Sequence, residues 1–379
     1  MKQKYEIGVY YFPGYHADAR VSQWHGPNWT EWALLRAARP RFNGHQQPKV
    51  PLWGYEDESL PRVMNKKAST AAAHGISHFI FDWYHYDGKP FLNHALDNGF
   101  LKIKGGAPIK FALMWANHDW LNIQPASLAD SDTLLLSGLV DRKGFDKIAV
   151  HVIEKYFRSP HYWTIEGCPY FSIYDLPNLI KGIGGVAQLR DALSSFRKRV
   201  KQAGFRGLHL NLVHWQNTIV GSHNGVAKPA ETIKRLEFDS VSSYVWIHHY
   251  PGKRYEFPQT RYLDVLDYNA NYWRKTSREF GIPYFPNVTM GWDASPRCVQ
   301  TDAFEHRSYP FMPTLKGNTP ANFRRALLLA KRHVDSLQLP SRHFSINAWN
   351  EWTEGSYLEP DERNGFAYLE AIRDVFGSS

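Results

Sequence analysis

Cysteine is nearly absent from this chain of 379 residues, in which only Cys168 and Cys298 occur. Two cysteines this far apart cannot form a framework of several disulfides, and they do not form a cysteine-based metal site. The chain also lacks a run of about 18 apolar residues, so we expect no membrane insertion. Its first residues lack the apolar core of a signal peptide. This favours a cytoplasmic protein, and a periplasmic or secreted one would require that a signal had been removed.

Positive charge exceeds negative charge, with a formal net charge of +9 and a pI of about 9.3. Such a balance alone would allow binding to nucleic acid or to an anionic surface. However, the sequence contains no block of five or more basic residues. Its densest basic runs, 197–199 and 324–325, lie in helix-like segments. We interpret these runs as solvated helix faces and expect no nucleic-acid partner.

Familiar motifs for metal, nucleotide and serine chemistry are missing as well. There is no His-Glu-x-x-His, no EF-hand loop, no P-loop and no Gly-x-Ser-x-Gly elbow. We therefore expect no metal and no cofactor, and we assign neutral hydrogen-bonding roles to His85, His118 and His214. Aromatic residues, in contrast, make up 15% of the chain. Flat rings with polar edges build cores, and they also suit surfaces that stack on sugars.

Short apolar runs recur along the chain with helix-like segments between them. Several runs are almost continuously apolar, as is typical of strands buried on both faces of a parallel sheet. The predicted strands are 6–12, 76–84, 109–116, 170–174, 208–213, 238–245, 284–291 and 343–349. The predicted helices include 61–74, 144–157, 186–203, 262–280 and 320–336. Gly75, Gly204 and Gly281 are expected to end helices just before the next strand.

Eight such strand–helix units predict an α/β fold, namely a single (β/α)8 TIM barrel with long βα loops. We expect one catalytic domain over residues 1–379, and the sequence gives no indication of its oligomeric state. An open doubly wound sheet is the alternative. That fold usually carries Gly-x-Gly-x-x-Gly after its first strand, and the motif is absent there.

The active site of such a barrel lies at the C-terminal ends of its strands. Nearly every predicted strand ends in an aromatic residue together with a polar one, an arrangement that could stack on a sugar and bind its hydroxyls. For any single tryptophan, ordinary packing at the barrel rim is the competing interpretation. The candidate substrate-binding residues are Tyr11, His16, Glu31, Trp32, Asp82, Trp83, Tyr84, His85, Trp115, Asn117, His118, Asp119, Asp175, His214, Tyr244, Trp292, Trp349, Asn350 and Trp352.

Two carboxylates follow the eighth predicted strand, in the segment Asn350-Glu-Trp-Thr-Glu-Gly355. If this loop begins as a helical turn, Glu351 and Glu354 project to the same side. A carboxylate pair can protonate a leaving oxygen and act as base or nucleophile at an oxocarbenium-like centre, as glycosidic bond cleavage requires. A helix cap or a salt bridge at the rim is the alternative interpretation. Glu359, in contrast, is expected to be a solvated loop acid.

The segment 347–361 resembles the signature of WbsX-type domains, which are similar to glycoside hydrolase family 99. Other segments agree with this resemblance, which extends over residues 6–361: Tyr10–Pro13, Asn28–Trp32, Pro40–Pro48 and Phe111–Trp120. It implies a (β/α)8 barrel that acts on glycans, in bacterial polysaccharide or O-antigen metabolism. The segment 82–86 differs from the family's common form, and His118 stands where many relatives carry Glu. We expect these departures to affect which sugar is bound.

Family 99 hydrolases are retaining endo-α-mannosidases and mannanases, proposed to use the sugar's own 2-hydroxyl as the nucleophile. By this resemblance, Glu351 would act as base toward the 2-hydroxyl, and Glu354 would be the acid/base for the leaving group. The resulting expectation is a retaining glycoside hydrolase whose partner is a polysaccharide or oligosaccharide. A glycosyltransferase or transglycosylase in surface-polysaccharide biosynthesis is the alternative, and a non-catalytic lectin-like barrel is a third reading.

Overall fold

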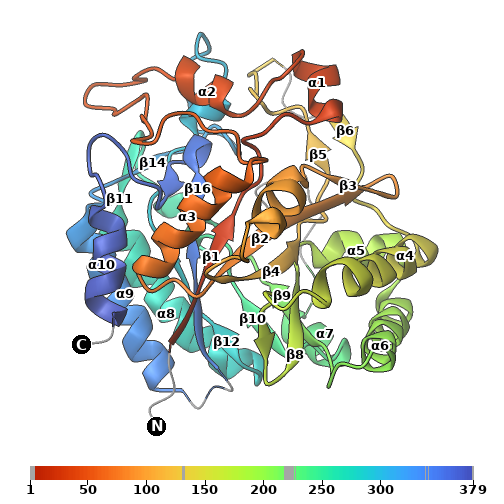
Figure 1. The fold of residues 1–379 in the computed structure, drawn as a ribbon. Helices are drawn as coiled ribbons and strands as arrows, with labels where there is room; N and C mark the ends of the chain where they lie inside the picture. Colours follow the sequence, from red (N-terminus) through yellow and green to blue (C-terminus); the bar gives the residue numbers. More distant parts are fainter. Residues whose placement is uncertain are drawn as a thin grey trace.

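A barrel of parallel strands forms the centre of the protein (Figure 1). The computed structural model describes residues 5–129, 133–216, 226, 228–337, 339 and 341–377. The barrel strands are β1 (Tyr5–Tyr11), β2 (His78–Tyr86), β4 (Lys110–Trp115), β8 (Cys168–Ile173), β9 (His209–Val213), β10 (Ser240–Ser242), β12 (Tyr284–Phe285), β13 (Asn287–Thr289) and β15 (Arg342–Asn347). Each of the eight predicted strands has a counterpart here, so the predicted (β/α)8 barrel is confirmed.

The barrel is closed at its seventh position by two short strands. β12 pairs with β10 through Tyr284 and Val241, whereas β13 pairs with β15 through Asn287 and Ser345. β15 in turn pairs with β1. The expected single strand over 284–291 is therefore divided at Pro286, which has no N–H to donate to a neighbouring strand. All of these pairings are parallel, so the C-terminal ends of the strands lie at one end of the barrel.

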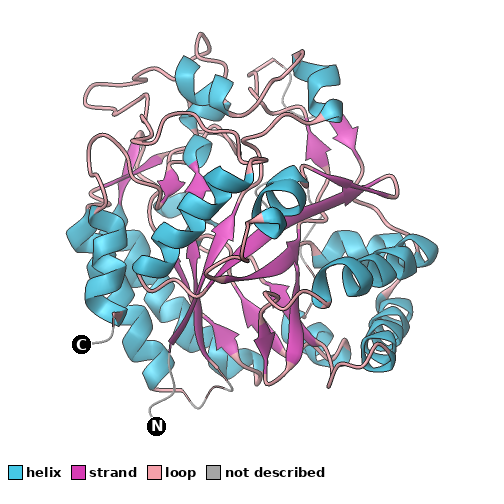
Figure 2. Ribbon diagram, in the orientation of Figure 1, coloured by secondary structure: helices cyan, strands magenta, loops and turns pink. Residues whose placement is uncertain are grey.

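Helices surround the barrel strands on the outside (Figure 2). In the described part of the chain they are α1 (Ala19–His25), α2 (Trp32–Ala37), α3 (Pro61–Ala73), α4 (Arg142–Val152), α5 (Leu176–Ile183), α6 (Val186–Gln202), α7 (Pro229–Arg235), α8 (Tyr262–Phe280), α9 (Pro320–Asp335) and α10 (Ala367–Phe376). All five predicted helices are present, and the one over 144–157 ends as the π-helical segment η3 (Ile153–Phe157). Gly75, Gly204 and Gly281 follow helices with positive φ angles of 86°, 96° and 63°, which glycine adopts without strain.

Long βα loops cover the end of the barrel at which the strands terminate. α1, α2, β5 and β6 lie in this layer, at the top of Figure 1, and the N-terminus lies at the bottom. The remaining short elements are β3 (Lys89–Phe91), β5 (Trp120–Leu121), β6 (Leu134–Leu136), β7 (Thr164–Ile165), β11 (Gln259–Arg261), β14 (Thr314–Lys316), β16 (Asn350–Glu351), β17 (Ser356–Tyr357), η1 (Ala95–Gly99), η2 (Phe100–Lys102), η4 (Trp246–His248), η5 (Gly252–Arg254), η6 (Ser295–Arg297) and η7 (Trp352–Glu354). Among the residues described, no helix has the length and apolar character needed to cross a membrane.

Buried histidines fill the barrel where its strands begin. The ring of His78 stacks on Trp163 with their centroids 3.9 Å apart, and His343 lies 5.2 Å from His78. Burial lowers the pKa of His343 to about 3 and that of His209 to about 4. The pKa of His78 falls well below its usual value for the same reason. These rings are therefore neutral in the folded protein at neutral pH.

We predict that His343 makes the folded state less stable as the pH falls below about 6.5, where the histidines of the unfolded chain take up protons. Buried acids with raised pKa values, such as Glu58 and Asp175, both near 7, act in the opposite direction. The comparison must therefore be made with His343→Asn, by urea denaturation between pH 7.5 and 4.5. The variant should gain about 1.4 kcal/mol relative to wild type for each pH unit well below 6.5. A constant difference across this range would contradict the prediction.

Candidate active site

An open cavity lies at the C-terminal ends of the barrel strands. Its walls come from loops that follow several different strands, as is typical of barrel enzymes. The lining residues are Phe12, Asp82, Tyr84, Met114, Ala116, His118, Asp119, Trp120, Leu121, Ile123, Gln124, Tyr174, Tyr244, Arg297, Tyr309, Glu351 and Glu354. Those named from the sequence as candidates are Asp82, Tyr84, His118, Asp119, Tyr244, Glu351 and Glu354.

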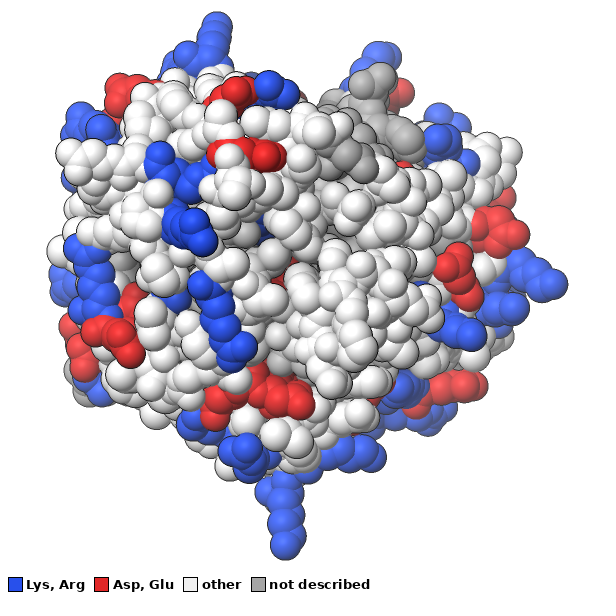
Figure 3. Space-filling model, turned by 90° about the horizontal axis from the view of Figure 1, so that it is seen from above, with Lys and Arg blue, Asp and Glu red and all other residues white. Residues whose placement is uncertain are grey.

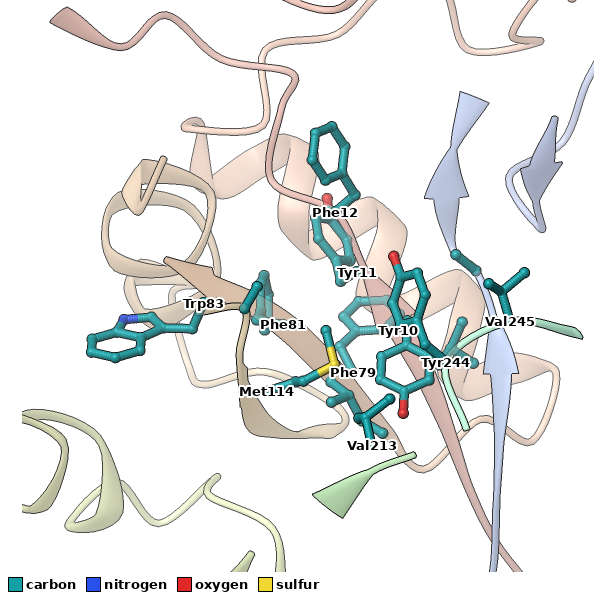
Figure 4. Close-up of a cluster of buried hydrophobic side chains, with 14 of the residues drawn as sticks. Tyr10, Tyr11, Phe12, Phe79, Phe81, Trp83, Met114, Val213, Tyr244 and Val245 are labelled. Atoms are coloured by element: carbon teal, nitrogen blue, oxygen red, sulfur yellow. The ribbon is translucent and has the colours of Figure 1, made fainter. Parts of the chain in front are cut away.

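Strand β2 delivers alternate residues to the cavity. Asp82 and Tyr84 line it, whereas Trp83 and His85 lie on the other face of the strand. The indole of Trp83 donates to the hydroxyl of Tyr156 at 3.3 Å. Figure 4 shows Trp83 pointing away from the neighbouring interior side chains. The structure therefore does not bring Trp83 and His85, both expected to bind substrate, to this cavity.

The same alternation applies to β4 and to the residues that follow it. Met114 and Ala116 line the cavity, but the candidates Trp115 and Asn117 do not. The side-chain amide of Asn117 donates to the backbone carbonyl of Asp175 at 2.7 Å. Asp175 itself caps α5, accepting a hydrogen bond from a backbone N–H of its first turn at 2.8 Å. These polar groups hold strand ends and a helix start, and they do not face the cavity.

His118 and Asp119 reach the cavity from the segment after β4. One oxygen of Asp119 accepts from the backbone N–H of Gly138 at 2.8 Å, which ties this segment to the loop after β6. Burial lowers the pKa of His118. The pKa values of His85 and His214 fall to about 4 for the same reason, so all three rings are neutral near pH 7. Within the described residues, no group of three His, Cys, Asp or Glu side chains is arranged to hold a metal ion.

Five further candidates also lie outside the cavity, each with a partner of its own in the surrounding packing. They are Tyr11, whose hydroxyl contacts Met64 Sδ at 3.0 Å; His16, which lies 3.1 Å from the carbonyl of Leu92; Trp32, which donates to the carbonyl of Glu56 at 2.9 Å; His214, 2.6 Å from the hydroxyl of Tyr272; and Trp292, whose ring lies 6.1 Å from that of Tyr309. Aromatic residues at the strand ends thus build the rim as well as the cavity.

Glu351 and Glu354 lie on a short hairpin and turn after β15. Glu351 belongs to β16, and Glu354 ends the single 3-10 turn η7. The expected helical turn is therefore present, and it directs both carboxylates toward one cation, Arg297. The guanidinium donates through Nη2 to Glu351 Oε2 at 3.1 Å and through Nη1 to Glu354 Oε1 at 2.6 Å. Its side chain is only 7% exposed, so this contact is shielded from solvent.

Arg297 also joins the loop after β1 to this group. Its Nη2 lies 3.4 Å from Glu31, just before α2, and its Nε donates to Thr353 Oγ1 at 2.9 Å. Thr353 in turn donates to Glu31 at 2.5 Å. The candidate Glu31 therefore acts on the site through Arg297. A guanidinium with five donors in a fixed fork suits such a multiple contact.

Arg297 is the functional residue that the sequence did not reveal. It ends the 3-10 turn η6, which follows β13 after the irregular segment 290–294, and nothing in its local sequence sets it apart from the other basic residues. Tyr309 was missed as well, and its hydroxyl contacts Arg297 and donates to Glu354 Oε1 at 2.7 Å. Phe12 and Tyr174 could have been found by the alternation of strand side chains, since their neighbours Tyr11 and Asp175 were chosen instead.

The electrostatics of the carboxylate pair are set by burial and by Arg297. Burial raises the pKa of Glu351 well above its usual value, and the charge of Glu354 raises it further. Burial also raises the pKa of Glu354, while Arg297 and the Tyr309 hydroxyl oppose this rise. Two buried carboxylates thus share a single guanidinium, which opposes the effect of burial on both pKa values.

A third carboxylate, Asp82, reaches the same pair through Tyr244. The Tyr244 hydroxyl lies 2.9 Å from Asp82 Oδ2 and 3.2 Å from Glu351 Oε1. The other oxygen of Asp82 has no hydrogen-bond partner among the described residues. Burial raises the pKa of Asp82 well above its usual value. Figure 4 shows Tyr244 beside Tyr10, on the interior side of the barrel.

A buried ion cluster supports the hairpin from behind. Lys67 on α3 contacts Glu58 at 2.6 Å and Glu359 at 2.5 Å. The indoles of Trp349 and Trp352 each donate to Glu359 at 2.8 Å. The expectation of a solvated Glu359 was wrong, because the chain folds back after the hairpin and leaves this side chain 5% exposed. The two tryptophans therefore hold the hairpin and do not line the cavity.

Asn350 completes this support. Its side-chain amide donates to the carbonyl of Phe12 at 2.7 Å and to Glu58 at 2.9 Å, and it accepts from the Phe12 N–H at 2.9 Å. The candidate Asn350 thus fixes the residue next to Glu351 against the end of β1. Through these contacts Trp349, Asn350 and Trp352 hold the segment that carries Glu351 and Glu354.

The surface around the cavity carries mixed charge. Figure 3 views this end of the molecule, and it shows Lys and Arg side chains interspersed with Asp and Glu around a broad uncharged area. The excess of positive charge is thus spread out on this face. It forms no continuous basic track of the kind that follows a nucleic-acid backbone.

We predict that Arg297→Gln lowers the free energy of unfolding by about 3–5 kcal/mol, because it leaves buried carboxylates without their cation. The matched control is Arg190→Gln. Arg190 pairs with Glu237 at 2.8 Å, with both side chains 55% exposed, so its loss should change stability by less than about 1 kcal/mol. Chemical denaturation of both variants at pH 7 measures the difference. Equal stability of the two variants would contradict the central role of Arg297.

Comparison with solved structures shows the same fold. The chain is similar to a glycoside hydrolase-like protein, with a TM-score of 0.64 and 13% identity over 100% of this chain and 95% of that one. It is also similar to a GH99 endo-α-mannosidase from Bacteroides thetaiotaomicron, with a TM-score of 0.60 and 11% identity over 98% and 95% of the two chains. At these identities the likeness establishes the architecture of the barrel.

Sequence relatives extend over nearly the whole chain. It is 27% and 26% identical to two uncharacterized WxcX proteins from Xanthomonas campestris pv. campestris, over 97% of this chain. The chain spans about half the length of these relatives, at 49%. A family model described as glycosyltransferase WbsX matches residues 7–372. With the barrel and the Asn-Glu-Trp-Thr-Glu hairpin in place, this match shows that the chain belongs to the WbsX family.

Proposed function

We propose that this protein is a retaining glycoside hydrolase that acts on a polysaccharide or oligosaccharide, with Glu351 and Glu354 as its catalytic pair. The observation that carries the proposal is the placement of both carboxylates on adjacent nitrogens of one buried guanidinium, at the mouth of the barrel. Adjacent nitrogens keep the two acids close together, so that both can act on one sugar. The fold shared with glycoside hydrolase-like proteins supports this function.

The side chains that line the cavity suit a sugar in composition. Tyr84, Trp120 and Tyr174 offer aromatic faces, and Asp82, Asp119 and Gln124 offer polar atoms. Rings with polar neighbours bind both the C–H faces and the hydroxyls of a sugar. A carbohydrate is therefore the partner that we propose for this cavity.

The roles of the two acids follow the family 99 pattern in this proposal. Glu351 removes the proton from the sugar 2-hydroxyl, whose oxygen bonds to the anomeric carbon as the glycosidic bond breaks. Glu354 gives a proton to the leaving oxygen and then takes one from water, whose oxygen bonds to the anomeric carbon. The bond from this carbon to the 2-oxygen breaks, and Glu351 returns its proton to that oxygen. The anomeric configuration is inverted twice and thus retained.

The unliganded contacts of Glu354 favour its ionised form, because Arg297 and Tyr309 both donate to Oε1. A general acid must instead be protonated. The proposal therefore requires that the substrate displaces or lengthens these two contacts when it enters. Desolvation by the bound sugar acts in the required direction, since burial raises the pKa of a carboxyl group.

We predict that Glu351→Gln and Glu354→Gln each lower kcat by about 10²–10⁴-fold, because each removes a proton-transfer group and keeps its shape. Glycan binding should remain within a few-fold of wild type in both variants. Glu370→Gln, on the exposed side of α10, is the matched control and should leave turnover unchanged. Near-normal hydrolysis by either active-site variant would refute the catalytic pair.

The substrate should be sought by a screen of bacterial surface polysaccharides and α- and β-linked oligosaccharides. NMR spectroscopy of the first product formed reports both cleavage and anomeric configuration. Retention supports the proposed mechanism, whereas inversion would replace it with direct attack by water. Cleavage within a chain or from its end distinguishes endo from exo action in the same experiment.

Transfer of a sugar is the second candidate function, and the description of the family as a glycosyltransferase favours it. Many nucleotide-sugar enzymes carry an Asp-x-Asp element. The sequence has this spacing at Asp130-Ser-Asp132, which lies outside the described residues. Incubation with nucleotide sugars and an oligosaccharide acceptor separates the two functions. Transfer from a nucleotide sugar without hydrolysis of any glycan would favour the transferase.

A further inference from the structure

Asp82, Tyr244 and Glu351 form a chain of hydrogen-bonding groups. If both acids are ionised, the Tyr244 hydroxyl supplies only one proton for the chain's two hydrogen bonds. The hydroxyl of Tyr244 lies 2.9 Å from Asp82 Oδ2 and 3.2 Å from Glu351 Oε1. A phenol carries a single proton and can donate one full hydrogen bond. If both carboxylates were ionised, one of these two contacts would bring two hydrogen-bond acceptors together with no proton between them. One additional proton resolves this conflict.

The distribution of cations decides which carboxylate carries the proton. Arg297 donates to Glu351 at 3.1 Å, so the charged form of Glu351 is stabilised directly. Asp82 has no salt bridge among the described residues, and Tyr244 is its sole hydrogen-bond partner there. Asp82 is 3% exposed, and an isolated buried carboxylate is strongly disfavoured. The neutral acid is therefore the stable form of Asp82.

The other charged and titratable groups around Asp82 reinforce this choice. The groups that face it from the neighbouring elements are Tyr10, Tyr84, Tyr174, Glu351, Glu354 and Arg297. Arg297 is the cation among them, and it is already shared by Glu31, Glu351 and Glu354. Adding a fourth negative charge would leave the cluster with three uncompensated charges in a buried site.

We propose that Asp82 is a neutral carboxylic acid in the resting protein, and that it donates to Tyr244 so that Tyr244 donates to Glu351. Asp82 is thus a positioning residue that acts through Tyr244. It orients the Tyr244 proton toward Glu351, and this hydrogen bond acts together with Arg297 against the effect of burial, so that both favour the ionised form of Glu351 that a base requires. The role of Glu351 as a base rests on the proposed function, whereas the protonation of Asp82 does not.

The protonation of Asp82 is tested without any substrate. Infrared difference spectra between wild type and Asp82→Asn at pH 7 should contain the C=O band of a protonated carboxyl group. This band should shift in Tyr244→Phe, because Asp82 loses its acceptor there. A difference spectrum with only carboxylate bands at pH 7 would overturn the proposal. The Tyr244→Phe spectrum keeps the test decisive if Asp82→Asn does not fold.

Asp175→Asn is the matched control for this measurement. Asp175 is also a buried acid, and burial raises its pKa to about 7, but it caps α5 and has no contact with Tyr244. Its own carboxyl band should therefore be unaffected by Tyr244→Phe. If both bands shifted equally in Tyr244→Phe, the shift would not be specific to the hydrogen bond between Asp82 and Tyr244, and the proposal would fail.

A kinetic experiment tests the consequence for Glu351, with the glycoside found by the screen. Asp82→Leu should lower kcat/KM by roughly tenfold, the effect of one lost positioning hydrogen bond. Asp82→Asn should recover most of this loss, since an amide N–H can donate to Tyr244 as the protonated acid does. Wild type should also lose activity at alkaline pH as Asp82 ionises, and this limb of the pH profile should be missing in Asp82→Asn.

The two arms separate the present inference from the proposed function. If no glycoside is cleaved by wild type, the proposed function fails, and the infrared spectra still decide whether Asp82 is protonated. If glycosides are cleaved but Asp82→Asn is as impaired as Asp82→Leu, with its alkaline limb in place, the positioning role of Asp82 is overturned. Recovery by Asp82→Asn together with a protonated band in wild type supports it.

Discussion

The guanidinium of Arg297 is the interaction on which the site depends. Three acids reach it from two ends of the chain: Glu31 from the loop after β1, and Glu351 and Glu354 from the hairpin after β15. Without Arg297, these buried carboxylates would repel one another, and the repulsion would favour a conformation in which one of them faces solvent. A single planar cation with several donors holds them together, and their directions are set by its fork. The cost of burying these charges is offset in part by the one cation and in part by the hydroxyls of Thr353 and Tyr309, which also donate to the acids.

A second buried cation, Lys67, holds two further carboxylates together behind the site. Lys67 joins Glu58 and Glu359, and Glu359 also receives both indole N–H groups of the hairpin. The hairpin is thus clamped between a cluster that faces the cavity and one that faces α3. Such opposed anchoring limits the movement of Glu351 and Glu354, and the proposed catalytic role requires that their oxygens be held within about 0.5 Å of the productive geometry. The supporting residues and the two carboxylates thus belong to one short segment of the chain.

The strands and their order could be predicted because the strands and helices of a parallel barrel alternate along the sequence in a recognisable hydrophobic pattern. Strands such as β2 and β15 are buried on both faces and read as apolar runs, and glycines mark the helix ends between them. The candidate site was found in outline for the same reason, since parallel strands end at one edge. The residues that line the cavity could not all be predicted. The choice between Trp83 and Tyr84, or between Tyr174 and Asp175, depends on which face of the strand points inward. A shift of one residue exchanges the two sets.

By itself the sequence determined the barrel, the carboxylate pair at its mouth and the resemblance that the family match bears out. These features are local or periodic, so neighbouring residues specify them. Only the tertiary structure decided that Arg297 is the partner of that pair, that Glu359 is buried and that Asp82 reaches Glu351 through Tyr244. Arg297 and Glu31 are far apart in sequence, and Asp82 and Glu351 are as well, so no local pattern encodes their contact. They meet because the closed barrel brings the ends of all its strands together, and buried charge then stays only where a partner of opposite sign or a proton is present.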